Sequence, residues 1–467
     1  MRSFLASLWL LLALSGCVYY GDIHGHSDPV SPCCLMNKHV YRVPHHTMAD
    51  RAAWWHRFHD PQLDQLINVA LCHSPTMKQA EARIRLANSL ADAAATSLWP
   101  SIDFSGYVQR QRFSQFGLAP PPFNGRTFNI GTLAFNFNYE FDFWGKNREL
   151  LASRISEVCA AEADDAQARL VLSAAVAGVY FQLLGDIKAV QLTKRNLEFT
   201  REISAIVVDR AKNGIESDIP VKSAVADTEG ASLVVEKYKQ LEALARNQLA
   251  VLLGDNAMAT QIKTRPFTYH VYHVHLPACL PANLLAHRPD IYASRSRVEA
   301  AAHLINVTKA RFFPDINLNG LFSYQSVGLG HLFDRVSQNN AITGAVDLPI
   351  FDAGLRRAEL RSNYAEYDLA VNQYNQTILT ALREVADQAA TLKALRAQLR
   401  SENNALLATQ RNDHLFMSRY QHGVIDYVPV LEMREVLVQQ QITQLNLEVN
   451  QLRAVVDMIK ALGGVTG

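Results

Sequence analysis

The segment Thr132–Phe143, TLAFNFNYEFDF, alternates strictly between two kinds of side chain, and this alternation decides the fold class. Its odd-numbered residues are apolar or aromatic, and its even-numbered residues are small or polar. Successive side chains of a β-strand point to opposite faces of the sheet, so the segment predicts a strand with one aromatic and one polar face. A membrane-spanning strand needs about ten such residues, although a half-buried sheet of a water-soluble domain has the same period.

Three further segments show the same alternation, so that the sequence predicts strands at about 102–112, 130–143, 315–326 and 341–351. Four strands are too few to close a membrane barrel, because single-chain barrels have about eight or more. An open sheet edge cannot face lipid, since its backbone groups would lack hydrogen-bond partners. If these strands span a membrane, several copies of the chain must therefore close one barrel.

Very long helices follow the strands. Residues 146–212 contain no proline and carry apolar residues at spacings of three and four, and a second such series starts near Leu360. Sustained spacing of this kind is typical of a coiled coil. The long helices end at Gly214 and Gly423, which suit the turn after a helix. Shorter helices, at about 217–253 and 425–462, then return antiparallel. The predicted fold is mainly helical with a small β part.

The whole plan occurs twice in the sequence. Arg-x3-Gly-x5-Pro begins at Arg210 and again at Arg419, and Trp99-Pro100 recurs as Phe313-Pro314. Several matches in the same order indicate a duplication. Each repeat opens with a helix, at about 60–98 and 282–311. The predicted organisation is listed here: signal peptide 1–16, anchored N-terminal arm 17–59, first repeat 60–254, linker 255–281 and second repeat 282–467.

The first residues predict the compartment. An apolar run after Arg2 is too short to span a bilayer and is typical of a secretory signal. It ends in Leu14-Ser15-Gly16-Cys17, which resembles a bacterial lipobox. Cys17 is therefore expected to carry diacylglycerol and an N-acyl chain; the alternative is an ordinary signal peptide with an incidental cysteine. In lipoproteins an Asp after the cysteine favours inner-membrane retention, so Val18 permits sorting to the outer membrane.

Composition and motifs exclude several classes of function. Lys+Arg is 45 and Asp+Glu is 44, so the chain lacks the basic balance of a nucleic-acid binder. The sequence contains no HExxH, GxSxG or P-loop motif, so no enzyme is predicted. His273 and His275 could share one strand face and bind a metal, but an ordinary surface strand has the same pattern. We predict no metal and no cofactor other than the lipid on Cys17.

Several motifs of the chain, taken in order, are those of a known family. They are Trp54-Trp55-x2-Phe58-x-Asp60-Pro61, Phe141-Asp-Phe-Trp144-Gly145, Arg288-Pro289-Asp290-Ile291 and Tyr420-x2-Gly423-Val424. The chain resembles the TolC-like outer-membrane efflux channels, in particular their lipoprotein branch related to nodulation and multidrug efflux factors. The resemblance covers nearly all of the chain from Trp54 onward. It implies a homotrimer with a twelve-stranded barrel in the outer membrane and a long periplasmic α-helical tunnel. It also implies docking through a periplasmic adaptor onto an inner-membrane pump.

A passive duct must close at its periplasmic end when no pump is docked. We expect Tyr420, Asp426, Glu432 and Asp218 to form this gate, with carboxylates repeated by symmetry as rings. Glu432 lies nine residues after the tip glycine, where the family often has an acid. Asp218 and Asp426 could instead be helix N-caps, and Glu432 an ordinary solvated residue. Pro220 departs from the family pattern at the first tip.

The two tip glycines, Gly214 and Gly423, are expected to let the adaptor approach closely. The predicted function is an efflux duct for drugs or other small solutes. Two alternatives stay open from the residues: a lipid-anchored coiled-coil scaffold or adhesin, and a type I secretion outlet for peptides or proteins.

Overall fold

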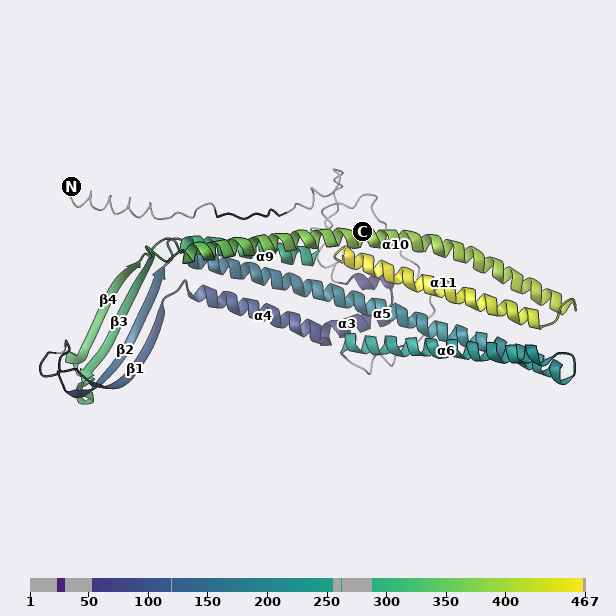
Figure 1. Cartoon of the computed structure of the whole chain (residues 1–467), viewed down its shortest axis with the longest axis horizontal. Helices are drawn as coiled ribbons and strands as arrows, with labels where there is room; N and C mark the ends of the chain where they lie inside the picture. Colours follow the sequence, from purple (N-terminus) through teal and green to yellow (C-terminus); the bar gives the residue numbers. More distant parts are fainter. Residues whose placement is uncertain (1–22, 30–52, 119, 255–261, 263–287, 465–467) are drawn as a thin grey trace. The chain divides into compact units, whose positions relative to one another are not determined.

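The computed structural model of the chain describes residues 23–29, 53–118, 120–254, 262 and 288–464 (Figure 1). They fall into two compact units. Unit 1 contains residues 1–29, 83–162 and 293–375, and unit 2 contains the remainder. Cys17, the signal segment, most of the predicted arm, and both His273 and His275 lie outside the described residues.

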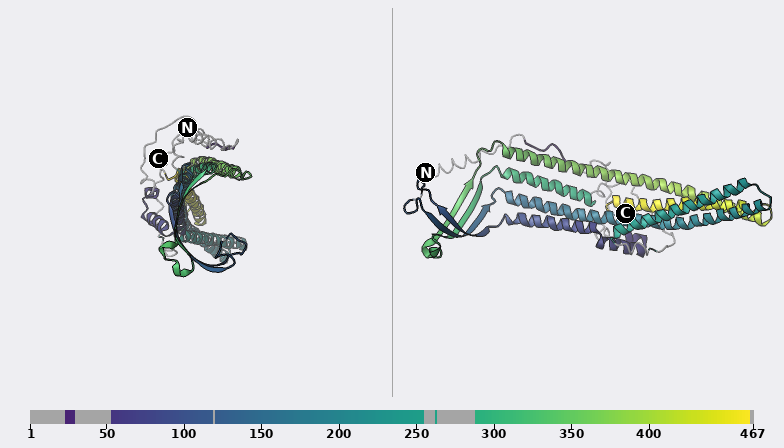
Figure 2. Two further views of the ribbon diagram at one scale, coloured as in Figure 1. Left: turned by 90° about the vertical axis from the view of Figure 1, so that its left-hand side faces the viewer. Right: turned by 60° about the horizontal axis from the view of Figure 1, so that its bottom comes forward.

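Unit 1 contains one antiparallel sheet in the order β1-β2-β3-β4, drawn as a single curved layer in Figure 2. The strands are β1 (Ser101–Arg112), β2 (Thr127–Phe141), β3 (Asp315–Val327) and β4 (Gln338–Asp347). The expected fourth strand at 341–351 is displaced toward the N-terminus, because Pro349 has no N–H to donate to a ladder. The second strand ends two residues early, since Asp142 instead binds the start of the next helix.

The helices of the two units are listed here: η2 (Trp54–Phe58), α3 (Pro61–His73), α4 (Pro75–Thr96), α5 (Lys146–Lys212), α6 (Asp218–Leu253), α9 (Pro289–Ala310), η3 (Leu329–His331), η4 (Arg335–Ser337), α10 (Leu355–Gln421) and α11 (Val428–Ala461). The expectation of one helix over 60–98 is wrong. The helix is interrupted at Ser74, whose backbone is extended, with a ψ of 132°. Pro75 disfavours the helical conformation of the residue before it and begins a new helix instead.

The core of unit 2 lies along α5. Tyr180 and Phe181 of this helix are fully buried against α3 and the segment that precedes it. At Gly185 the helix meets α11 so closely that an added Cβ would lie 2.5 Å from a methyl carbon of Val449. The central stretch of α5 is long and apolar enough to cross a membrane, but 78% of that window is buried inside the protein. This stretch therefore packs as a core helix against the rest of the protein.

Both repeats turn in the same way at the end of the long helix. Gly214 has a φ of +74° and Gly423 a φ of +71°. Ile215 N–H donates to Arg210 O and Val424 N–H to Arg419 O, each at 2.9 Å. This is the Schellman arrangement, in which a glycine adopts the left-handed conformation that other residues avoid. The duplicated Arg-x3-Gly spacing is therefore a duplicated turn.

Candidate functional site

The sheet has two chemically different faces, as the alternation predicted. The register pairs Phe104 with Phe135 and Phe135 with Phe322, so three aromatic rings cross neighbouring strands on one face. These rings are 61%, 54% and 53% exposed. On the other face Asp103 pairs with Asn136. One face thus offers aromatic rings to an apolar environment and the other offers polar groups to water.

Both outer strands of the sheet have only one neighbour. β1 pairs with β2 alone and β4 pairs with β3 alone within the described chain. Each therefore leaves one row of backbone donors and acceptors without a strand partner, over 12 residues in β1 and 10 in β4. Such long open edges pair readily with another strand.

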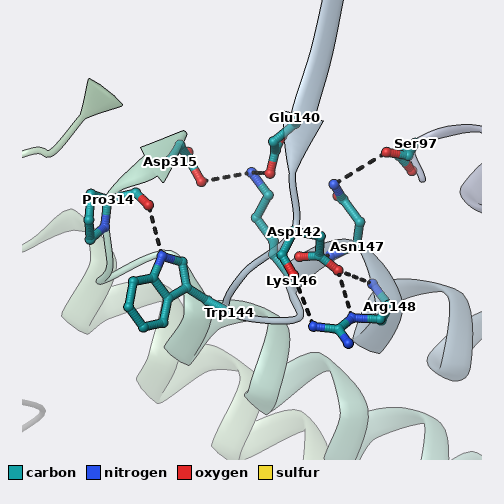
Figure 3. A network of polar contacts seen from close by, with 9 residues as sticks. All are labelled: Ser97, Glu140, Asp142, Trp144, Lys146, Asn147, Arg148, Pro314 and Asp315. Carbon is teal, nitrogen blue, oxygen red and sulfur yellow. Dashed lines mark hydrogen bonds and ion pairs between the residues drawn. The ribbon is translucent and has the colours of Figure 1, made fainter. Parts of the chain in front are cut away.

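A polar network joins the end of β2 to the start of α5 (Figure 3). The carboxylate of Asp142 accepts from Asn147 N–H at 3.1 Å and from Arg148 N–H at 2.9 Å. These are N–H groups of the first helical turn, which otherwise lack partners, and a carboxylate also suits the positive end of the helix. Arg148 Nη2 returns to Asp142 O at 2.9 Å. The network fixes the direction in which the helix leaves the sheet.

Two further side chains of the same junction reach the second repeat. Lys146 Nζ lies 2.7 Å from Glu140 and 3.2 Å from Asp315. Trp144 Nε1–H donates to Pro314 O at 2.9 Å, and its ring stacks on Phe313 at 4.6 Å (Figure 3). The Trp144-Gly145 motif of the first repeat therefore packs against the Phe313-Pro314 motif of the second.

At the tips of unit 2, an arginine joins the two helical hairpins. Arg210, at the end of α5, lies 3.2 Å from Asp426 in the second tip and 3.4 Å from Glu216 in its own. The rings of Tyr420 and Tyr427 lie 4.9 Å apart. Two of the four gate candidates, Tyr420 and Asp426, thus make specific contacts at the tip.

The other two candidates are placed differently. Asp218 is the first residue of α6 and exposed, while Ser217 occupies the N-cap position without a side-chain cap bond. Tyr427 holds the corresponding position of α11, so neither Asp218 nor Asp426 is an N-cap. Glu432 is exposed. Burial and the nearby charges of Asp227 and Glu432 raise the pKa of Glu435, a neighbour that the sequence did not single out.

An N-terminal segment is bound to α10 within unit 1. Asp368 accepts two backbone hydrogen bonds at 2.8 Å, from His26 N–H and from Ser27 N–H. Asn372 Nδ2 donates to Ser27 Oγ at 2.8 Å, and Asn375 Nδ2 donates to Asp28 O at 3.2 Å. The segment Ile23–Pro29 is therefore held in a defined place on this helix. The described residues contain no group of three or more metal-ligating side chains.

Comparison with known proteins identifies the family. The model of the outer membrane efflux protein family matches residues 66–255 and 280–464. The multidrug resistance outer membrane protein MdtQ of Escherichia coli O157:H7 is 30% identical over 474 residues, which cover 97% of this chain and 96% of that protein. The chain belongs to the outer membrane efflux protein family.

Solved structures agree with this assignment. The outer membrane protein VceC from Vibrio cholerae has a TM-score of 0.80 at 33% identity, covering 89% of this chain and 99% of that one. The CmeC outer membrane channel of Campylobacter jejuni has a TM-score of 0.82 at 22% identity and shows the shared fold alone. The mainly helical TolC-like fold with a small sheet and two repeats is confirmed. The protein is an outer-membrane efflux channel and not an enzyme, so the scaffold alternative is wrong.

Three contacts of this efflux protein have no local signal in the sequence. Arg210 appears there only as a marker of the repeat and Arg288, which binds Glu384 and Ala461 O, only in a family motif, and Asp368 looks like any acid on a long helix. Each acts on residues far away in the sequence, such as His26, which is 342 residues from Asp368. Only the folded chain brings these groups together.

Replacing Asp368 by alanine should release the segment Ile23–Pro29 from α10. A backbone hydrogen bond to a charged group stabilises by about 1.5–3 kcal/mol, so the amides of His26 and Ser27 should exchange with solvent about 10- to 100-fold faster. Hydrogen-exchange mass spectrometry of the 23–29 peptide measures this. Asn372→Ala removes the bond to the Ser27 hydroxyl and a bond to Asp368 O, but it leaves the Asp368 carboxylate in place and should change exchange much less. Equal rates in wild type and Asp368→Ala would contradict the assignment.

Replacing Lys146 by methionine should destabilise the junction by about 1–2 kcal/mol, because it leaves Glu140 and Asp315 without their shared cation. Burial alone would lower the pKa of Lys146, but its hydrogen bonds to the two carboxylates outweigh burial and raise it. A raised lysine pKa stabilises the fold fully below the unfolded value of about 10.4, and the effect is lost as pH rises through the folded value. The difference in thermal unfolding midpoint between wild type and Lys146→Met should therefore be the same at pH 7 and at pH 9. The exposed pair variant Lys239→Met is the control.

Proposed function

We propose that this channel is the outer-membrane duct of a tripartite export system. It receives drugs or other small solutes from an inner-membrane pump through a periplasmic adaptor and conducts them passively. The relatives MdtQ and MdtP are multidrug resistance outer membrane proteins by name, which supports drugs over secreted peptides.

The open sheet edges carry this proposal. A membrane leaves no water to satisfy a free edge, so β1 and β4 must find strand partners. β4 of one copy pairing with β1 of the next, repeated around an axis, closes a barrel without any edge. Three copies of four strands give the twelve-stranded barrel expected of the family. The aromatic face then meets lipid and the polar face lines a wet pore.

The N-terminal segment supports a lipid anchor on Cys17. About six residues separate Cys17 from the bound segment that starts at Ile23, a reach of at most about 20 Å. Since Ile23–Pro29 is fixed to α10 by Asp368, acyl chains on Cys17 would enter the membrane close to this part of unit 1.

The tip contacts support a periplasmic gate. Arg210 and Asp426 join the two hairpins of one copy, and Tyr420 packs against Tyr427 in the second tip. Moving the second hairpin away from the first breaks this pair in every copy. Asp218 and Glu432 add exposed carboxylates near the tips, and Gly214 and Gly423 leave backbone accessible for an adaptor.

Cross-linking and conductance of the purified full-length protein test the proposal together. Cross-linked species should end at three copies, and the same preparation should form channels in a planar bilayer. Affinity capture from the native envelope should bring down an adaptor and a pump. A monomer that inserts stably into the bilayer, or a trimer that conducts no ions in any condition, would contradict the proposed duct.

A further inference from the structure

The connection between β3 and β4 folds back over the aromatic face of the sheet. The loop, Gly328–Ser337, lies at the end of β3 that is remote from its preceding helix α9. Gly131 of β2 is two residues from Leu133 and shares its face, on which Phe135 also lies. A Cβ added at Gly131 would lie 2.9 Å from Leu329 Cδ2 and 3.2 Å from Leu332 Cδ2. The missing side chain of Gly131 thus makes room for two leucines of the loop.

The loop is held in shape by its own hydrogen bonds. Gly328 N–H donates to Asn129 O at 2.7 Å, which continues the sheet into the loop. Ser337 Oγ donates to His331 O at 2.7 Å, and His331 Nδ1 lies 2.8 Å from an Asp334 carboxylate oxygen. Short 3-10 turns at Leu329–His331 and Arg335–Ser337 complete the fold of the segment. The backbone of the loop is therefore held in one conformation.

Two apolar side chains of this loop are strongly exposed, beside the paired His331 and Asp334. Leu332 is 8% exposed and anchors the loop to the sheet, whereas Phe333 is 78% and Val336 is 92% exposed. Arg335 lies between these two in sequence and is also exposed. A long cationic side chain among apolar tips is the composition of a membrane interface, where the rings enter the lipid and the guanidinium reaches the head groups.

Lipid fits this surface better than a second copy of the chain does. In the proposed barrel, copies join through the sheet edges, whereas Leu329 and Leu332 seat the loop on the sheet face at Gly131, the face that also carries the exposed ring of Phe135. Burial of Phe333 and Val336 in lipid removes their apolar area from water. Arginine also forms strong paired hydrogen bonds with phosphate, which outer-membrane lipids carry.

We propose that Gly328–Ser337 is a membrane-interface anchor, in which Phe333 and Val336 insert at the lipid boundary and Arg335 binds a lipid phosphate. This inference rests on the proposed function, because it takes the aromatic face of the sheet as the lipid-facing one. It adds a specific lipid contact beyond the strands themselves, and it gives Gly131 a role as the seat of the loop.

Site-specific photo-cross-linking in native outer membranes tests the anchor. The benzophenone analogue of phenylalanine replaces Phe333 in one variant, Phe322 on the aromatic face in a second, and Leu321 on the opposite face in a third. Channel conductance of each variant verifies that it has folded and assembled. Lipid adducts should form at Phe333 and Phe322 with similar yields, about tenfold above Leu321, because an aromatic side chain prefers lipid to water.

The three positions separate the possible failures. Lipid capture at Phe322 with none at Phe333, or capture of a neighbouring copy at Phe333, overturns the anchor and leaves the duct standing. No lipid capture at Phe322 removes the lipid-facing assignment of the sheet, and the anchor falls with it. With the benzophenone kept at position 333, Arg335→Gln should lower the yield of phosphate-bearing lipid several-fold; an unchanged yield overturns the phosphate contact.

Discussion

Replacing Arg288 by methionine should be among the most destabilising substitutions in unit 2, by about 3 kcal/mol. Arg288 is 4% exposed, and its guanidinium donates to Asp290 at 2.7 Å, to Glu384 at 2.9 Å and to Ala461 O at 2.9 Å. One cation thus connects the start of α9, the middle of α10 and the last turn of α11. Removing one partner of a buried ion pair leaves the others desolvated and unpaired, which costs about 3–5 kcal/mol when all are buried. Asp290 and Glu384 keep some contact with water, so the lower end is expected.

Thermal unfolding of the purified channel measures this loss. For chains of 150–250 residues, 1 kcal/mol lowers the midpoint by about 2–4 °C, and the shift is smaller for a chain of 467 residues, so a fall of a few degrees is expected. Arg295→Met is the matched control, because Arg295 forms an exposed pair with Glu299 one helical turn away. That control should change stability by less than about 0.5 kcal/mol. Arg288→Lys should fall between the two, since an ammonium group keeps the charge but loses the forked geometry. Equal midpoints for Arg288→Met and Arg295→Met would show that the buried network contributes nothing.

The sequence predicted those parts of the fold that depend on local periodicity. The alternation of Leu133, Phe135 and Phe137 gave the face of β2 directly, because side-chain direction in a strand repeats every two residues. The tip glycines were found from a spacing that the duplication repeats, and only glycine suits their positive φ. Boundaries were less certain wherever a single residue interrupts a pattern. Pro349 shortened the last strand, and Pro75 divided the first helix.

The functional contacts were harder to predict, because they depend on which distant residues the fold brings together. Arg288 lies 173 residues from Ala461, whose carbonyl it binds. Asp426 was selected for its charge and its place near a tip glycine, but its partner Arg210 could not be known before the hairpins were placed side by side. A carboxylate on a helix face has the same local sequence whether it is solvated or paired. The side chains that the sequence missed are therefore those that act across long sequence separations.

Replacing Asp426 by alanine should shift the channel toward its open state by roughly 3- to 150-fold in the open-to-closed ratio. The Arg210–Asp426 pair is partly exposed, and a pair of this kind contributes only about 0.2–1 kcal/mol. In a trimer, however, concerted opening breaks three such pairs, which together amount to about 0.6–3 kcal/mol. Single-channel recording measures the open probability directly. Raising the salt concentration should open the wild-type channel and affect the variant less, because screening weakens exposed charge pairs.

Companion variants determine whether the pair itself is responsible. Arg210→Ala alone and Arg210→Ala with Asp426→Ala should open the channel no more than Asp426→Ala does, since each removes the same interaction. Additive effects would mean that the two residues act separately, for example through Glu216, which also binds Arg210. Glu432→Ala should have a smaller effect, because Glu432 is exposed and lies on α11 beyond the tip turn. If Asp426→Ala and Glu432→Ala both close as wild type does, the gate does not lie at these carboxylates, and closure must depend on contacts between copies that involve neither residue.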